Sequence, residues 1–396
     1  MGYLSGTDEA GKPNPAALMT RVIRQGGPGA WGQFWQLLRL RFGGAGTNLD
    51  EFYTYGLWRR PEGPKILREL LPHSKLKAFN AALRMPHYGP ETEVLVDKLA
   101  TEALLNANGF ATSRTLAAYG PAPEGSSAQV LRDAGAIRAY MSDPVNLPLF
   151  GKPRADSFAR GAVAVVSVDD SRRTLTFLDG MVAPIAALAD EIVADWATGY
   201  LFQPFYQTHP DLRRHIGQAM ASLRIVTLLT DRGVEPYYAV LRIPAKTAMH
   251  DGDAVGRRVW GLVDLATGAV VKLRNLRDPL TPDLLHVLDP EVPLLGMVLP
   301  HWDEALASVL AAHRRFPGHG ILGWDVFLTP DAALLNEVNA NPGHVYQAAA
   351  ARGIRNGDLE PLYARALAHT RAVNARVVKD SVVHAAKPLS PQASSD

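Results

Sequence analysis

The chain has 396 residues, of which 47% are hydrophobic, so it is long enough to bury the cores of two or three packed subdomains. Lys and Arg number 41 against 39 Asp and Glu, and the formal net charge of +2 gives no reason to expect nucleic acid or an anionic membrane as a partner. The absence of cysteine excludes disulfides, thiolate metal sites, iron–sulfur clusters and cysteine nucleophiles.

The first unit, residues 1–90, is expected to be a helical N-terminal region with a disordered start, because residues 2–15 are rich in Gly, Pro, Ser and Ala. No secretory signal precedes it, and no run approaches the roughly eighteen apolar residues of a membrane span, so we expect a cytoplasmic protein. From residue 30 to about 86, apolar residues recur at helical spacing. We interpret the aromatic residues of this pattern as core: Trp31, Phe34, Trp35, Phe42, Phe52 and Trp58.

The second unit, residues 91–200, is predicted to begin with a helix over residues 91–108. The pattern then indicates a helix around residues 126–134 and a strand over residues 137–140. Two more strands and a helix complete a small α+β lid: residues 161–168, 174–178 and 184–196.

The third unit, residues 201–380, opens on a strand that stops at Pro204 and is followed by a flexible tail over residues 381–396. Its strands and helices alternate in the following order: strands at 223–229, 237–243, 259–265 and 269–273, a helix at 303–315, a hairpin, and a helix at 359–373. Runs of strands with helices segregated between them predict an α+β fold rather than a doubly wound parallel sheet.

The hairpin carries the residues that say most about function. Residues 323–329 and 334–343 flank a Thr-Pro-Asp turn, and Glu337 and Asn339, two positions apart, share a face close to Asp325. Such hard oxygen ligands suit Mg²⁺, which takes further ligands from water and nucleotide phosphates. The alternative is a hairpin whose acids face solvent, but the apolar residues around them indicate burial.

A second group of residues is suited to phosphate. Lys152 opens a loop of small and polar residues, in which backbone N–H groups and the Ser157 hydroxyl would donate to phosphate oxygens while Lys152 and Arg160 offset their charge. The loop does not match the Walker pattern, and a snorkelling surface lysine is the alternative. Arg224 and Arg242 lie between apolar neighbours in predicted strands, where each points either to solvent or inward to an anion.

In this order, the features resemble the ATP-grasp superfamily. Asp97-Lys98 before a helix looks like the opening of that fold, and Phe150-Gly151-Lys152-Pro153 looks like its second nucleotide-binding lysine. Glu337-Val338-Asn339 is similar to the metal motif of D-alanine-D-alanine ligases. Through residues 323–326 and 223–227 the likeness is closer to the sugar-transfer-associated ATP-grasp family. The resemblance covers about residues 91–375.

The resemblance implies an ATP-grasp fold in which residues 91–200 and a catalytic subdomain, residues 201–380, grip ATP between them. It implies the following roles: Lys98 and Lys152 on the phosphates, Arg154, Ser157 and Arg160 in the closing lid, Gln203 and Phe205 against adenine, Asp211 at the ribose, and Asp325, Glu337 and Asn339 on Mg²⁺. We expect Asp325→Asn, Glu337→Gln or Asn339→Ala to lower turnover by orders of magnitude with the fold intact.

The chain departs from the resemblance in one place that bears on catalysis. D-Alanine-D-alanine ligases carry an arginine two residues before the first metal Asp, whereas this chain has Gly323. The cation at the transferring phosphoryl or acyl-phosphate group must come from elsewhere, and Arg224 or Arg242 are the candidates.

The activity implied is an ATP- and Mg²⁺-dependent carboxylate–amine ligase that forms an amide or peptide bond through an acyl phosphate on a small molecule, sugar acid or peptide. The alternatives are a kinase of a small molecule and a non-catalytic nucleotide-binding partner of a biosynthetic assembly. The expected partners are ATP, a carboxylate and an amine acceptor, with no nucleic acid. The identities of the two substrates stay open, as does a homo-oligomeric state.

Overall fold

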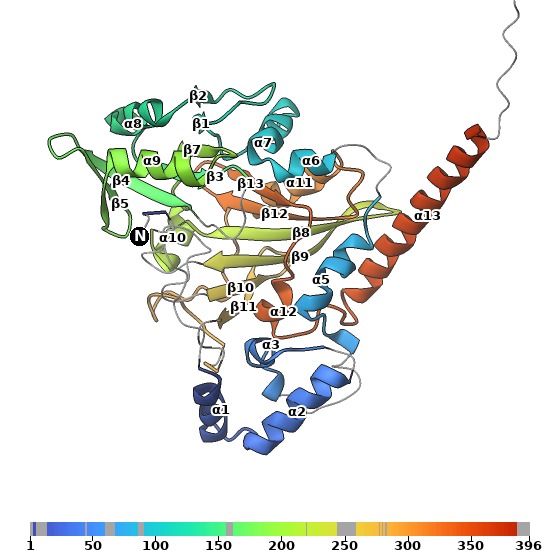
Figure 1. Ribbon diagram of the computed structural model, residues 1–396. Helices are drawn as coiled ribbons and strands as arrows, with labels where there is room; N and C mark the ends of the chain where they lie inside the picture. The colour runs from blue at the N-terminus through green and yellow to red at the C-terminus, as the bar shows by residue number, and fades with distance from the viewer. Residues whose placement is uncertain are drawn as a thin grey trace, which may run out of the picture.

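The computed structural model describes residues 3–4, 14–43, 46–59, 68–85, 91–155, 161–218, 220–243, 259–276, 278, 280–281 and 283–385. They form two β-sheets with helices packed against them, so the predicted α+β class is confirmed (Figure 1). Within these ranges no helix combines the length and apolar character needed to cross a membrane.

The six-stranded sheet is antiparallel throughout, in the order β11-β10-β9-β8-β12-β13. Its strands are β8 (Ser222–Thr230), β9 (Gly233–Ile243), β10 (Val259–Val263), β11 (Val270–Asn275), β12 (Ile321–Leu328) and β13 (Ala333–Asn339). The central strand β8 is buried along almost its whole length, because both faces of the sheet are covered.

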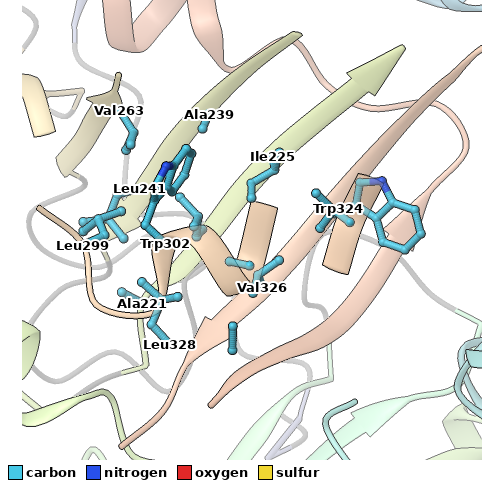
Figure 2. Close-up of a cluster of buried hydrophobic side chains, with 14 of the residues drawn as sticks. Ala221, Ile225, Ala239, Leu241, Val263, Leu299, Trp302, Trp324, Val326 and Leu328 are labelled. Atoms are coloured by element: carbon cyan, nitrogen blue, oxygen red, sulfur yellow. The ribbon is translucent and has the colours of Figure 1, made fainter. Parts of the chain in front are cut away.

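Alternate residues of these strands enter two separate cores. One face packs against α11 (Trp302–His313), and Trp302, Ile225 and Val326 lie in its buried cluster (Figure 2). The opposite face packs against α5 (His73–Ala81), α12 (Tyr346–Ala350) and α13 (Glu360–Ala385), with Val226 and Val240 among the buried residues. The sheet is therefore fixed from both sides, which holds its polar side chains in place.

The seven-stranded sheet has the order β2-β1-β7-β3-β4-β5-β6, and only its β1–β2 pair is parallel. Its strands are β1 (Ala117–Tyr119), β2 (Gln129–Leu131), β3 (Leu149–Pro153), β4 (Val163–Asp169), β5 (Thr174–Phe177), β6 (Val182–Pro184) and β7 (Tyr200–Pro204). Helices α8 (Ala134–Ser142) and α9 (Ile185–Asp195) pack on one face, and Leu99 of α7 (Lys98–Ala107) packs on the other.

The N-terminal part of the chain also contains α1 (Pro15–Arg24), α2 (Ala30–Phe42), α3 (Leu49–Thr54), the 3-10 turn η1 (Leu57–Arg59) and α6 (Glu91–Val96). The 3-10 turn η2 (Pro144–Asn146) and α10 (Pro210–Ile216) follow later in the chain. Helices α1, α2 and α3 lie at the lower end of the molecule, away from the seven-stranded sheet, whereas α5 lies against the six-stranded sheet and α13 (Figure 1). Tyr3 and Leu4, in the stretch expected to be disordered, donate their backbone N–H groups to the Glu191 carboxylate of α9.

Two predictions of secondary structure are wrong. The helix expected around residues 126–134 is replaced by β2, and the strand expected over residues 137–140 lies inside α8. Asp133 starts that helix because its side chain accepts from the Ala136 N–H, and Ile137, Tyr140 and Met141 bury one helical face. Over four residues, apolar positions at helical spacing were mistaken for a strand.

The prediction that the N-terminal aromatic residues form core is wrong for α2. Phe52 and Trp58 are buried, but the side chains of Trp31, Phe34, Trp35 and Phe42 are exposed. The terminal helix is also longer than predicted, since α13 runs to Ala385 rather than to residue 373. How the chain divides into domains remains a prediction.

Candidate functional site

The two sheets meet where β3 approaches β13. Lys152, in β3, donates from Nζ to Asn336 Oδ1 over 3.0 Å, and the Ser113 hydroxyl donates to the same oxygen over 2.8 Å. Asn336 reaches both groups because the register of β12 with β13 shifts at this residue: Asp325 pairs with Glu337 and Val326 with Leu335. Such a β-bulge redirects a side chain that regular alternation would send elsewhere.

Lys152 is buried, with only 8% of its surface exposed, so the alternative of a surface lysine is wrong. Burial lowers its pKa to about 8, the Glu337 carboxylate opposes that shift, and the Lys98 ammonium adds to it. Lys98 begins α7 and donates from Nζ to the Pro153 carbonyl over 3.3 Å. The structure therefore brings both predicted phosphate-binding lysines into one neighbourhood.

Asp325 lies at the centre of a buried charge cluster, which we call the arginine–aspartate cluster: Asp325, Arg224 and Arg242. In the antiparallel register, Asp325 of β12 is opposite Arg224 of β8. Arg224 donates from Nε to Oδ1 over 2.5 Å and from a terminal nitrogen to Oδ2 over 2.9 Å. A terminal nitrogen of Arg242 lies 2.9 Å from Oδ1, while its Nε donates to the Ser222 hydroxyl.

Neither arginine points to solvent, because Arg224 is 6% exposed and the Arg242 side chain 18% exposed. Burial by itself opposes ionisation of Asp325, but the two guanidinium groups outweigh it and lower the pKa of the carboxyl. Burial by itself lowers the pKa of Arg224, but the pairing with Asp325 outweighs it and raises that pKa. Of the two alternatives left open by the sequence, both arginine side chains therefore point inward, and the anion that they meet is the carboxylate of Asp325.

The side chains that could donate oxygen ligands to a metal ion are those of Glu337, Asn339 and Asp325. Both oxygens of Asp325 already accept hydrogen bonds from guanidinium groups. Glu337 is partly exposed, and the Asn339 amide has a buried nitrogen position with no partner among the described residues. No group of three His, Cys, Asp or Glu side chains suited to a metal occurs in the described ranges. The oxygens present fit Mg²⁺, which needs only one or two carboxylates when phosphate and water complete its shell.

Gly323 explains how the chain departs from the ligase motif. A Cβ built on Gly323 would lie 2.6 Å from Cβ of Pro342, so no side chain fits there while the segment after β13 stays in place. An arginine at this position is sterically excluded. The cations beside Asp325 come instead from β8, which pairs with β12, and from β9, the next strand of the sheet.

A contact from the N-terminal helices was not predicted from the sequence. Oδ1 of Asn80, in α5, lies 2.9 Å from His344 Nε2 and can accept a hydrogen bond from it. The Asn80 amide nitrogen donates to Asn341 Oδ1 over 2.6 Å and to the Pro342 carbonyl over 3.0 Å. His344 Nδ1 lies 3.1 Å from the Tyr238 hydroxyl, and burial lowers the pKa of His344 to about 3. The only sequence signal was the polar run directly after Asn339.

Other predicted residues have partners elsewhere. The Arg154 guanidinium donates to both carboxylate oxygens of Asp97, over 2.7 and 2.5 Å, and to the Pro121 carbonyl. The Gln203 amide nitrogen donates to the Ser113 carbonyl over 2.9 Å and lies near Thr115. Each of these bonds joins parts of the protein, and the phosphate and adenine roles of Arg154 and Gln203 remain predictions.

The remaining assignments are also untested. The Phe205 N–H donates to the Pro148 carbonyl at the end of β7, and Asp211 is exposed in the first turn of α10 (Pro210–Ile216). Ser157 and Arg160 lie outside the described residues. Glu102 was missed: its carboxylate accepts from the Thr115 N–H and hydroxyl and contributes to the field at Lys152.

Fold and site together define a class: an α+β protein whose two sheets meet at a cluster of lysine, arginine and acidic side chains, as in the ATP-grasp fold. The family described as sugar-transfer associated ATP-grasp matches residues 85–360, more than half of the chain. The chain therefore belongs to the sugar-transfer associated ATP-grasp family, and the resemblance seen in the sequence is confirmed.

Several solved structures are similar to the chain in fold. The L-amino acid ligase from Bacillus licheniformis is 14% identical with a TM-score of 0.35, over 64% of this chain and 42% of that one. The D-alanine-D-alanine ligase from Coxiella burnetii is 13% identical with a TM-score of 0.40, over 74% and 62%. The N5-carboxyaminoimidazole synthase from Aspergillus clavatus is 14% identical with a TM-score of 0.35, over 69% and 54%. The chain thus spans less than two thirds of each, and no curated protein matches it.

Proposed function

We propose that the chain is an ATP- and Mg²⁺-dependent ligase that joins a carboxylate to an amine through an acyl phosphate. The observation that carries this proposal is the buried Lys152, which donates to Asn336 and feels the Glu337 carboxylate, beside the arginine–aspartate cluster. Phosphoryl transfer depends on positioned charge more than on a covalent nucleophile, which suits a chain without cysteine.

Lys98 and Lys152 would bind the phosphates of ATP. Two neighbouring ammonium groups repel each other, and burial further disfavours the charge on Lys152, whose pKa falls to about 8. A polyphosphate placed beside them reverses both effects, because it supplies negative charge and accepts hydrogen bonds from each ammonium. The free protein therefore holds a positive site that gains stability when an anion arrives.

Glu337 and Asn339, with Asp325, would hold Mg²⁺. When bound, the ion neutralises charge on the transferring phosphoryl group. Both oxygens of Asp325 already accept from guanidinium groups, so this carboxylate also fixes Arg224 and Arg242 in position. We assign to these arginines the stabilisation of the phosphoryl and acyl-phosphate oxygens, which planar guanidinium groups match in geometry.

The reaction has two steps. First, an oxygen of the substrate carboxylate attacks the γ-phosphorus of ATP, the bond from that phosphorus to the bridging oxygen breaks, and ADP leaves with the electron pair. Second, the amine nitrogen attacks the acyl carbon, the carbon–oxygen bond to the phosphate breaks, and inorganic phosphate leaves while the nitrogen loses a proton.

The test is a screen of carboxylic acids and amines for ADP release, followed by an isotope experiment on any pair that responds. A carboxylate labelled with ¹⁸O must transfer one labelled oxygen to inorganic phosphate if an acyl phosphate forms. Hydroxylamine in place of the amine should trap the same intermediate as a hydroxamate. Lys152→Ala and Glu337→Gln serve as variants, and Leu285→Ser, at an exposed position, serves as the matched control.

Amine-dependent ADP release with label in the phosphate and an amide product by mass spectrometry would support the ligase. ADP release without any amine, with a stable phosphorylated product, would replace the ligase by a kinase. ATP binding measured by calorimetry without turnover on any acid would favour a non-catalytic nucleotide-binding partner.

A further inference from the structure

Helix α2 presents an apolar stripe to solvent. Trp31, Phe34, Trp35 and Phe42 are 73%, 48%, 60% and 78% exposed. At about 100° per residue, their positions fall within an arc of about 100° on one side of the helix. Large exposed apolar patches on a folded protein mark a surface that binds something.

The stripe is held outward by the opposite side of the same helix. Leu40 is buried there, and Gln33 donates from its amide nitrogen to the Met19 and Pro28 carbonyls and accepts from the Tyr53 hydroxyl. A buried amide with three partners fixes the rotation of α2 about its axis. The Phe34 ring also meets Trp31 and Trp35 edge to face, with ring centroids 5.8 Å apart in both pairs, so the aromatic surface is ordered before it meets a partner.

The stretch of sequence that contains the stripe carries charge of one sign. Residues 10–49 contain no Asp or Glu, whereas their basic residues are Lys12, Arg21, Arg24, Arg39 and Arg41. Arg21 pairs with Asp278, but Arg24, in the last turn of α1, and Arg41, in the last turn of α2, are exposed. The net charge of +2 for the whole chain conceals this local excess, because the acidic residues lie elsewhere in the sequence.

We propose that the outer face of α2 binds the surface of an anionic lipid membrane, with the aromatic side chains inserted among the acyl chains and Arg24 and Arg41 at the headgroups. Helices that combine Trp, Phe and Leu on one face with arginine beside it lie in the plane of such an interface. Helix α2 stands at the opposite end of the molecule from β3 and α8, so docking through it leaves the meeting of the two sheets uncovered (Figure 1). This inference does not depend on the proposed function.

The test uses the full-length protein and vesicles of about one-third phosphatidylserine in phosphatidylcholine, with pure phosphatidylcholine vesicles beside them. We expect flotation with the anionic vesicles and little with the neutral ones, and release as salt rises from about 0.1 to about 0.5 M. Trp31→Ser with Trp35→Ser should weaken binding at least about tenfold, because two aromatic anchors are lost. Arg24→Gln with Arg41→Gln should weaken it by about fivefold for each arginine. Val145→Ser, at an 81% exposed apolar position on another part of the surface, is the control and should bind as the parent does.

Failure of the parent protein to bind anionic vesicles would overturn the proposal, as would binding that the tryptophan variant leaves unchanged. Equal binding to neutral vesicles would refute the part assigned to the arginines. The alternative partner for the stripe is a second copy of this chain, which sedimentation equilibrium would detect. A dimer that the two serine substitutions convert to monomer, together with no vesicle binding, would identify that partner and overturn the membrane proposal.

Discussion

Replacing Asp325 by Asn should destabilise the protein strongly, in contrast to the intact fold expected from sequence. The carboxylate neutralises two buried arginines, and an amide offers one acceptor oxygen and a nitrogen that donates. Removing one partner of a buried ion pair costs about 3–5 kcal/mol, since the charge left behind stays desolvated. In a chain of 396 residues that corresponds to a fall in melting temperature of about 4–6 °C.

Glu337→Gln is the matched comparison, because Glu337 is opposite Asp325 in the register but partly exposed and without an ion pair among the described residues. Its stability cost should be below about 1 kcal/mol. Both variants should lose turnover if both residues hold Mg²⁺, so stability rather than activity separates them. The measurement is urea unfolding followed by tryptophan fluorescence and circular dichroism at pH 7.5. An Asp325→Asn variant as stable as Glu337→Gln would refute the reasoning that the arginine–aspartate cluster holds β8, β9 and β12 together.

Three further outcomes are expected. Since the pKa of Lys152 is lowered to about 8, kcat/KM for ATP should fall as the pH rises above about 8, and Lys152→Arg, which stays charged, should lose that decline; a parallel decline in both proteins would exclude Lys152 as its source. Gly323→Ala should cost about 1–3 kcal/mol, because its Cβ would lie 2.6 Å from Pro342, whereas Gly343→Ala, with nothing within 4 Å, should cost less than half as much in the same urea titration; equal midpoints would contradict the steric argument. Burial lowers the pKa of His313 to about 4 and of His344 to about 3, so below pH 6.5 the unfolded state binds more protons than the native state. Stability should therefore fall by about 1.4 kcal/mol per pH unit for each of them between pH 6 and 5, and urea midpoints that do not change with pH would show that these histidines are not buried neutral.

Local patterns predicted the hairpin well. The Thr-Pro-Asp turn and the alternation on both sides of it sufficed to place Asp325 close to Glu337, and in the structure the two are paired in register. Family motifs placed Lys98 and Lys152 together although 54 positions separate them along the chain, as the contribution of Lys98 to the pKa of Lys152 shows.

Contacts between distant strands and helices were beyond such patterns. That both arginines turn toward Asp325 depends on β8 lying between β9 and β12, and sequence order does not fix which strands are neighbours. The pairing of Asn80 with His344 spans 264 positions. The exposed aromatic residues of α2 were misread for a related reason, because helical spacing reports an apolar face but not whether anything covers it.

The contacts of α5 show that the packed core extends beyond the part of the chain that the family matches. The family match begins at residue 85 and ends at 360, so it excludes α5 and nearly all of α13. Yet Phe79 stacks on Tyr363 with ring centroids 3.8 Å apart, and the Leu83 carbonyl accepts from the Gly320 N–H at the start of β12. A fragment cut at the limits of the family would lose both rings of that stack and leave the Gly320 N–H and His344 without their partners Leu83 and Asn80. Truncations meant to isolate the ATP-grasp core should begin ahead of α5 and keep α13.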